Sequence, residues 1–372
     1  MAGQREVFVD FYDYLNLGDD LLFFVLAQRY AHVRFAYAEQ HPRPVAFRLP
    51  NVRRMPRIPY VDGMLRRLRI PFSLNEACRR RAIRQSRHAV RLGGSLYMER
   101  GEWQDNVRRD LALLSSPGGA IYLNGNFGPW RTEGFLATYV RLFSEALDVT
   151  VRDNWSFAQL AGVPQLRMAP DLIFSLSSDV RMAERGGVVI SLINLDGRPG
   201  ISEHREAYER AMAELVEDLV KDGQQVTLMS FCAAEGDELA VDRVASLVPS
   251  PARGAVTTHY YRGDMRAALT LLQRTETVVA TRFHAMVLGL AFGCRVNCVE
   301  YSDKVANALD DLGLGHLGWS IEEFVTATRV ERHRRATALS VTLADGEDLA
   351  RRANQHFAVL DQLLAGPPPR TA

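Results

Sequence analysis

The chain has 372 residues, of which 47% are hydrophobic and 24% are charged, so it is too long for one small domain and too mixed to be disordered or fibrous. Its 45 basic and 44 acidic side chains give a formal net charge of +1, which does not indicate a nucleic-acid-binding protein. We therefore expect two compact domains and no nucleic acid partner.

The N-terminal residues predict a strand, a turn and a helix. Residues 6–12 form an apolar run rich in Val and Phe, and residues 21–30 repeat apolar side chains at helical spacing. The polar turn between them lacks the glycine spacing of a nucleotide-binding loop. We expect it to line a ligand-binding cleft. The residues that would do so are Asn16, Gly18 and Asp19.

A basic segment follows at residues 52–91, where twelve arginines accompany two carboxylates, Asp62 and Glu76. Three interpretations stay open: a solvated helical surface, peripheral docking on an anionic membrane face, and binding of an acidic glycan or a lipid-linked diphosphate. Few aromatic residues are interleaved for base stacking, which disfavours nucleic acid.

Three motifs of the first half are candidate site elements. Glycines in RLGGSLY and in YLNGNFGP permit close approach of a ligand to the backbone, and they also suit ordinary tight turns. In VRDNWSFAQL, Arg152 ends a predicted strand and either faces the cleft or pairs with Asp153. The candidates from the two glycine motifs are Gly93, Gly94, Asn124 and Gly125.

The second half alternates strands and helices, which indicates parallel α/β sheets with right-handed crossovers. A polar stretch at 177–187 marks the boundary between the two halves. We expect α/β domains over 1–180 and 181–330, and a helical segment over 331–372 that packs back and ends in a frayed tail. The predicted strands are 188–193, 226–231, 277–281 and 296–301, and the predicted helices are 204–221, 264–274, 282–293 and 302–312.

The most informative motif begins where the strand 277–281 ends. Open α/β sheets bind ligands at the carboxyl ends of their strands, and a helix start favours anions. Arg282 would add a bidentate donor for phosphate or carboxylate, and His284 a proton near neutral pH. Tyr301 and Lys304 fall at the next such junction, and Lys304 is one of only two lysines in the chain. The alternatives are a packed histidine and a surface cation.

Several classes of protein are disfavoured. The sequence has no GxxxxGK[ST], HExxH or GxSxG motif and no metal-spaced cysteine pair, so a P-loop kinase, a zinc hydrolase and a standard serine hydrolase do not fit. It also shows no signal-peptide pattern and no apolar run approaching eighteen residues. We expect four reduced, packed thiols in a cytoplasmic protein.

The order of these pieces resembles the polysaccharide pyruvyltransferase family. The resemblance extends from about Tyr14 to about Leu314 and is most specific in ATRFHAMVLGLAFG followed by VEYSDKV. It implies two Rossmann-like domains similar to GT-B glycosyltransferases, with the acceptor on the N-terminal domain, the donor on the C-terminal domain, and the active site in the cleft between them.

The resemblance also implies the chemistry. The family transfers the enolpyruvyl unit of phosphoenolpyruvate to a sugar, usually as a cyclic ketal, on a bacterial surface or lipid-linked glycan. Arg282 and Arg152 would bind the donor's phosphate and carboxylate, and His284 would be the general acid or base. The donor is a substrate, so we expect no cofactor and no metal. Whether His284 protonates carbon or deprotonates the sugar stays open.

Two other functions remain as alternatives. A nucleotide-sugar glycosyltransferase of the same fold would need a ribose contact, for which Glu300 is the candidate. A non-catalytic protein that binds a glycan or an anion would keep the fold without turnover. The acceptor sugar, the stereochemistry of the ketal and the oligomeric state are left open by the sequence.

Overall fold

The computed structural model of the protein describes residues 6–41, 49–68, 73–176, 185–338 and 346–365. Its backbone contacts divide the chain into two compact units. The first unit comprises Met1–Asp13, Leu21–Leu172 and Arg352–Ala372, and the second unit comprises Tyr14–Asp20 and Ile173–Arg351.

These units differ in detail from the expected domains. The expected boundary at 180 and 181 lies outside the described residues, and the chain changes unit between Leu172 and Ile173. The expected segment 331–372 is divided, because only residues from Arg352 onward belong to the first unit. The short segment Tyr14–Asp20, which the sequence places in the N-terminal domain, belongs to the second unit.

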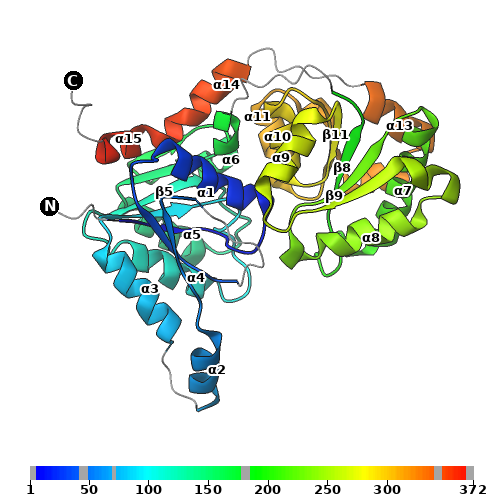
Figure 1. Ribbon diagram of the computed structural model, residues 1–372. Coiled ribbons are helices and arrows are strands. Elements are labelled where there is room, and N and C mark those ends of the chain that lie inside the picture. The colour runs from blue at the N-terminus through cyan, green and yellow to red at the C-terminus, as the bar shows by residue number, and fades with distance from the viewer. Residues whose placement is uncertain (1–5, 42–48, 69–72, 177–184, 339–345, 366–372) are drawn as a thin grey trace, which may run out of the picture. The chain divides into compact units, whose positions relative to one another are not determined.

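Among the described residues, seven parallel strands form the sheet of the first unit, in the order β3-β2-β1-β4-β5-β6-β7. Helices lie on both of its faces (Figure 1), so the central strands are buried along their length and are predominantly apolar. The strands are β1 (Val7–Asp10), β2 (Phe35–Ala38), β3 (Val52–Met55), β4 (His88–Leu92), β5 (Ala120–Gly125), β6 (Asp148–Val151) and β7 (Leu166–Met168).

Aromatic side chains cluster in the core of the first unit. Tyr97 packs edge-on against Tyr139 and Phe143, and Phe135 packs against Tyr139. Such contacts bury large apolar areas and fix ring orientation. The helices are α1 (Leu17–Arg29), which begins in the second unit, α2 (Pro59–Arg67), α3 (Leu74–Gln85), α4 (Trp103–Leu113), α5 (Glu133–Ser144), α6 (Asn154–Gln159) and α15 (Ala358–Leu364), and α14 (Gly346–Ala353) passes from the second unit into the first after Arg351.

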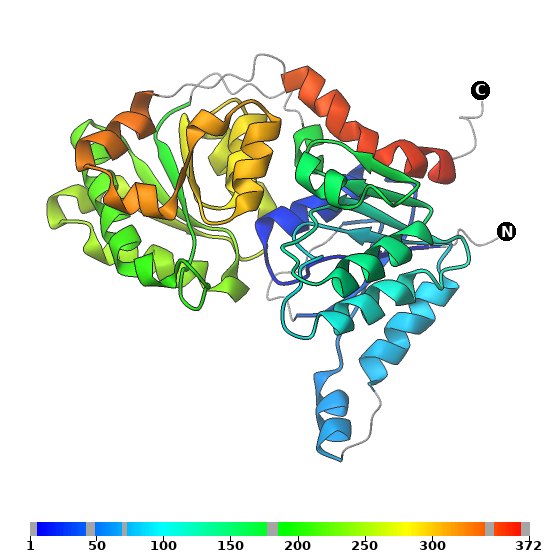
Figure 2. The same cartoon turned by 180° about the vertical axis from the view of Figure 1, so that it is seen from behind.

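In the described part of the second unit, six parallel strands pair in the order β10-β9-β8-β11-β12-β13. Figures 1 and 2 show helices on both faces of this sheet also. The strands are β8 (Val188–Leu192), β9 (Val226–Ser230), β10 (Val256–Tyr260), β11 (Thr277–Ala280), β12 (Arg295–Glu300) and β13 (Gly318–Ser320). The helices are α7 (Arg205–Lys221), α8 (Asp237–Leu247), α9 (Met265–Arg274), α10 (Phe283–Ala291), α11 (Asp303–Asp311), α12 (Ile321–Thr326) and α13 (Arg329–Ala338).

The prediction of two parallel α/β sheets is confirmed. One boundary differs in an informative way, since α1 begins at Leu17 and not at Leu21. The Asn16 side chain accepts a hydrogen bond from Gly18 N at 3.1 Å, and the Asn16 carbonyl accepts one from Asp20 N. Asn16 therefore caps the helix, and the expected polar turn forms its first turn.

The basic segment does not form one continuous surface. Arg79 and Arg91 are buried, and both pair with Asp10 at the end of β1, together with Arg109. Burial opposes ionisation of Asp10, but the charges of Arg109, Arg79 and Arg91 hold its pKa well below the usual value. Part of the segment therefore stabilises the interior of the first unit, with the Asp10 carboxylate as its anion.

Two further expectations concern the packing of the thiols and the absence of a membrane-spanning segment. Cys232, Cys294 and Cys298 are buried free thiols, as predicted, whereas Cys78 is exposed on α3, so the expectation of a packed thiol is wrong there. None of the described helices is both long enough and apolar enough to span a membrane.

The buried His356 makes the first unit sensitive to acid. Its ring nitrogens hydrogen-bond Thr150 Oγ1 at 2.7 Å and the Pro170 carbonyl at 2.9 Å. Burial lowers the pKa of His356 to about 4. Below its ordinary value near 6.5 the unfolded chain binds a proton that the folded chain does not, so stability falls as the pH drops from 6.5 towards 4, by about 3 kcal/mol in total.

We predict that His356→Gln flattens this dependence. Between pH 6.5 and 4.5 the variant should lose about 1.4 kcal/mol per pH unit less than the wild type, measured by urea unfolding. The exposed His316 provides a matched control, because His316→Gln should leave the profile unchanged. Parallel profiles for the wild type and His356→Gln would contradict the assignment.

Candidate functional site

The carboxyl ends of the second unit's strands are held together by one carboxylate. Asp237, the first residue of α8, is fully buried. Its oxygens accept hydrogen bonds from the backbone N–H groups of Asn194 at 3.4 Å, Phe231 at 3.3 Å and Cys232 at 2.9 Å. Asn194 follows β8, and Phe231 and Cys232 follow β9. Asp237 therefore ties two neighbouring strand ends to the start of α8.

Arg282 connects the third strand to the same carboxylate. It stands between β11 and α10, is buried, and donates from Nε to Asp237 Oδ2 at 2.8 Å and from Nη2 to Asp237 Oδ1. Its Nη1 donates to Glu235 Oε2 at 2.7 Å. The predicted bidentate donor therefore faces two protein carboxylates. Its binding of a phosphate stays a prediction, and its observed contacts are structural.

Glu235 links this pair to another arginine. Arg198, in the loop after β8, donates from Nη2 to Glu235 Oε2 at 2.6 Å. Burial raises the pKa of Glu235, but the charges of Arg282 and Arg198 outweigh it and lower the value to about 2. Glu235 is consequently ionised at neutral pH and shared by two guanidinium groups.

Tyr301 and Lys304 join the same cluster, as the sequence led us to expect for neighbouring strand ends. The Arg198 guanidinium carbon lies 5.4 Å from the centroid of the Tyr301 ring, and Lys304 Nζ lies 4.8 Å from it. Burial favours the neutral phenol, but the charges of Lys304 and Arg282 prevail and lower the pKa of Tyr301. The phenol is therefore a better proton donor than an ordinary tyrosine.

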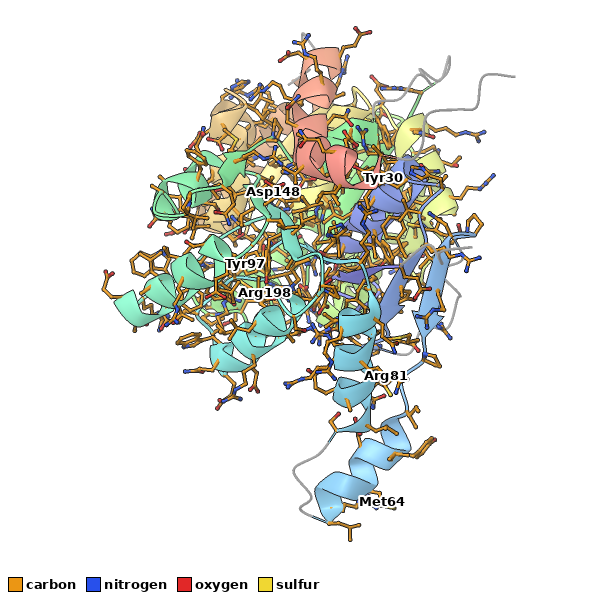
Figure 3. All side chains as sticks on the ribbon, turned by 90° about the vertical axis from the view of Figure 1, so that its left-hand side faces the viewer. Tyr30, Met64, Arg81, Tyr97, Asp148 and Arg198 are labelled. Carbon is orange, nitrogen blue, oxygen red and sulfur yellow. The ribbon has the colours of Figure 1, made fainter. Side chains whose placement is uncertain are left out.

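We refer to Arg198, Glu235, Asp237, Arg282, Tyr301 and Lys304 as the charged cluster. Three of these residues, Arg198, Glu235 and Asp237, were not predicted from the sequence. A usable signal existed, because all three follow the strands β8 and β9, and the rule that selected Arg282 applies equally to those strand ends. Arg198 is among the residues labelled in Figure 3.

His284 lies against the N-terminal segment of the chain. It is the second residue of α10, and a Cβ added to Gly18 would stand 1.7 Å from His284 Nδ1. Only glycine leaves room for the imidazole at that position. The two residues are distant in sequence, yet the second unit brings them into direct contact.

Backbone pairing fixes the segment Tyr14–Asp20 at this place. Leu17 N donates to the Phe231 carbonyl at 3.0 Å, and Asn16 forms a bridge with Cys232. Farther along, Tyr261 Oη donates to Asp20 Oδ2 at 2.6 Å. Asn16, Gly18 and the buried Asp19 are thus located at the same strand ends as His284 and Arg282. The structure brings these predicted residues together.

The remaining predicted residues gather at the carboxyl ends of β4, β5 and β6 in the first unit. A Cβ on Gly93 would lie 2.9 Å from Gly125 Cα, so these two glycines allow their strand ends to approach. Gly94 accepts a hydrogen bond from Asn126 N at 3.1 Å, and Arg152 N donates to the Gly125 carbonyl at 3.0 Å.

Arg152 is committed to a buried carboxylate. Its Nη1 donates to Asp171 Oδ2 at 2.9 Å, and Asn124 Nδ2 donates to the same oxygen at 3.2 Å. Asn124 adopts a left-handed backbone conformation with φ of 60°, and its Oδ1 accepts from Leu172 N. Arg152 thus pairs with the buried Asp171, and its contact with a donor carboxylate stays a prediction.

The fold defines the class of protein. The chain resembles the crystal structure of Anabaena Alr3699/HepE in complex with UDP and glucose, with a TM-score of 0.53, 12% identity, and coverage of 98% of this chain and 100% of that one. It also resembles a structure of the trehalose-6-phosphate synthase OtsA, with a TM-score of 0.50, 10% identity, and coverage of 98% and 100%. At these identities the likeness shows the fold alone, which is that of GT-B glycosyltransferases.

The family is more specific than the fold. Residues 16–303 match the family of polysaccharide pyruvyl transferases, which is most of the chain. The protein therefore belongs to the polysaccharide pyruvyl transferase family and is a transferase. The matched range begins at Asn16 and ends beside Lys304, so it includes the segment that contacts His284.

The buried pair between Asp237 and Arg282 gives a stability prediction. Asp237→Asn removes the charge that compensates Arg282 in the interior, which should cost about 3 kcal/mol of unfolding free energy. Urea unfolding measures the effect. Asp242→Asn, which alters an exposed carboxylate on the same helix, should change stability by less than about 0.5 kcal/mol. Equal stabilities of the two variants would contradict this account.

The contact between Gly18 and His284 gives a second prediction. Gly18→Ala must displace the imidazole, because the added methyl group overlaps it. The His284 resonance, identified in a ¹³C-ε1-histidine NMR spectrum by its loss in His284→Gln, should shift in Gly18→Ala. Gly254→Ala is the control, since a Cβ there meets no atom within 4 Å. An unmoved His284 resonance in Gly18→Ala would rule out the contact.

Proposed function

We propose that the protein transfers the enolpyruvyl group of phosphoenolpyruvate to a sugar of a bacterial surface or lipid-linked glycan and closes it into a pyruvate ketal. Membership of the pyruvyl transferase family supports the transferred group. The observation that carries the choice of donor is the charged cluster, in which three cations surround Tyr301.

The charge of the cluster suits an anionic donor. Arg198, Arg282 and Lys304 exceed Glu235 and Asp237 by one positive charge, and the start of α10 adds backbone N–H groups. Because Arg282 already holds two carboxylates, we assign it to positioning. Lys304 and the remaining N–H groups of Arg198 are the proposed direct contacts for the phosphate and carboxylate of phosphoenolpyruvate.

His284 and Tyr301 are our candidates for moving protons. Protonation of the donor's methylene carbon gives an oxocarbenium-like centre, which a sugar hydroxyl attacks as it loses its proton. Departure of inorganic phosphate then allows a second hydroxyl to attack the same carbon, and release of its proton completes the ketal. We assign these proton transfers to His284 and Tyr301, each worth about 10²–10⁴-fold in rate. The nearby cations stabilise the leaving phosphate.

The glycosyltransferase alternative lacks its expected ribose contact at Glu300. The Glu300 carboxylate lies against Gly318 of β13, since a Cβ there would stand 1.7 Å from Glu300 Oε1. Burial, together with the charges of Glu323 and Asp310, raises the pKa of Glu300. A carboxylate that lies against β13 beside other acidic groups is less available to accept hydrogen bonds from a ribose, which favours the pyruvyl donor.

Thermal unfolding with candidate donors tests the proposal. Phosphoenolpyruvate at about 100 times its dissociation constant should stabilise the protein by about 2.7 kcal/mol, and UDP-glucose should not. The two lysines of the chain provide matched variants. Lys304→Met should weaken stabilisation by phosphoenolpyruvate, and Lys221→Met, which removes an exposed cation of α7, should not.

Two outcomes would contradict the proposal. Stabilisation by UDP-glucose but not by phosphoenolpyruvate would support the glycosyltransferase alternative. Equal stabilisation of Lys304→Met and the wild type by phosphoenolpyruvate would place donor binding outside the charged cluster.

A further inference from the structure

Helix α2 and the residue that follows it, Leu68, carry an exposed apolar row. Tyr60 is 89% exposed, Met64 56% and Leu68 62%. Their spacing of four residues puts them on one helical face, and Arg67 falls on the same face beside Met64 and Leu68. Figure 3 labels Met64 near the far end of the projection that α2 makes from the first unit.

The projection is held in a defined shape by the contacts between α2 and α3. Asp62 of α2 accepts hydrogen bonds from Ser73 Oγ and Leu74 N, both at 2.7 Å, and from Asn75 Nδ2 at 2.6 Å. Ile58 N donates to Asn75 Oδ1 at 2.8 Å. The start of α3 is thereby fixed to α2. The apolar row is a feature of a folded surface and not of a loose loop.

The adjoining helix α3 is strongly basic on its exposed side. Arg81 and Arg84 are exposed on it, and the exposed Arg87 follows its end. The only acidic residue of α3 is Glu76, which already pairs with Arg80 at 2.8 Å. Figure 3 labels Arg81 on this helix, between the apolar row and the sheet. The projection therefore combines a row of large apolar side chains with excess positive charge.

We propose that this projection docks the first unit on an anionic lipid surface. Tyr60, Met64 and Leu68 would enter the boundary between headgroups and acyl chains, and the arginines would contact lipid phosphates. Charge complementarity favours lipid over a second copy of the chain, because two copies would bring like-charged arginines together. The proposal does not rest on the pyruvyl donor. Of the three interpretations of the basic segment, the proposal selects peripheral docking on a membrane for the exposed arginines.

Vesicle flotation of the full chain tests this docking. The wild type should bind vesicles of phosphatidylcholine containing about a third phosphatidylglycerol and should not bind phosphatidylcholine alone, and binding should fall with added salt. Replacing Tyr60, Met64 and Leu68 with serine should abolish binding. Replacing Arg81, Arg84 and Arg87 with glutamine should weaken it about 100-fold, at about fivefold per arginine.

Matched controls use residues elsewhere on the surface. Leu239→Ser with Leu247→Ser removes two exposed leucines from α8, and Arg108→Gln with Arg141→Gln removes two exposed arginines from α4 and α5. Both double variants should bind as the wild type does. Circular dichroism verifies folding, which the substituted residues should not disturb because they are exposed.

Three results would overturn the proposal. The first is wild-type binding that is absent or equal on neutral and anionic vesicles. The second is unchanged binding after the serine substitutions. The third is a dimer in sedimentation velocity that the serine substitutions convert to a monomer, since the row would then be a contact between two copies.

Discussion

The candidate site depends on the buried ion pair between Asp237 and Arg282. Removing two charges from water is costly, and the cost is offset only when the geometry is good and the remaining polar positions are filled. Here both conditions hold, since Arg282 reaches both oxygens of Asp237 and three backbone N–H groups fill the rest of that carboxylate. The backbone donors belong to the ends of β8 and β9, while Arg282 follows β11. The pair therefore sets the relative positions of three strand ends, from which the loops that carry Arg198, Glu235 and Arg282 start, while Tyr301 and Lys304 follow the neighbouring strand β12.

Arg282 acts on Tyr301 through its positive charge, while its N–H groups donate to Asp237 and Glu235. Arg282 contributes a positive charge that lowers the pKa of Tyr301 against the effect of burial, although two carboxylates occupy much of its guanidinium group. Lys304 adds the other charge and lies against the same ring. The cations around the Tyr301 phenol are already in position, so they need not reorganise when charge develops on a substrate. Electrostatic catalysis depends mainly on such preorganised charges. The proposed division of labour follows, with Arg282 positioning and Lys304 contacting.

Local pattern predicted the strands and helices because parallel sheets covered on both faces require apolar runs separated by amphipathic helices. The same rule placed Arg282, His284, Tyr301 and Lys304 at strand ends. Contacts between distant segments were beyond that reasoning. Nothing local to Gly18 indicates His284, and an Asp that begins a helix, as Asp237 does, looks like an ordinary first-turn residue. Arg198 was one arginine among many, so composition hid it, and only the fold shows that it shares Glu235 with Arg282.

The basic segment illustrates how position, and not residue type, decides the role of an arginine. Arg79 and Arg91 belong to the same run as Arg81 and Arg84, yet they are buried because β1 ends in Asp10, which supplies an anion inside the first unit. The exposed members have no comparable carboxylate within α3 beyond Glu76, and they adjoin a helix whose apolar row is already exposed. Large apolar side chains exposed beside cations are the combination that an anionic lipid surface would stabilise. Part of the segment thus stabilises the interior of the first unit, and its exposed part is the surface for which we propose lipid docking.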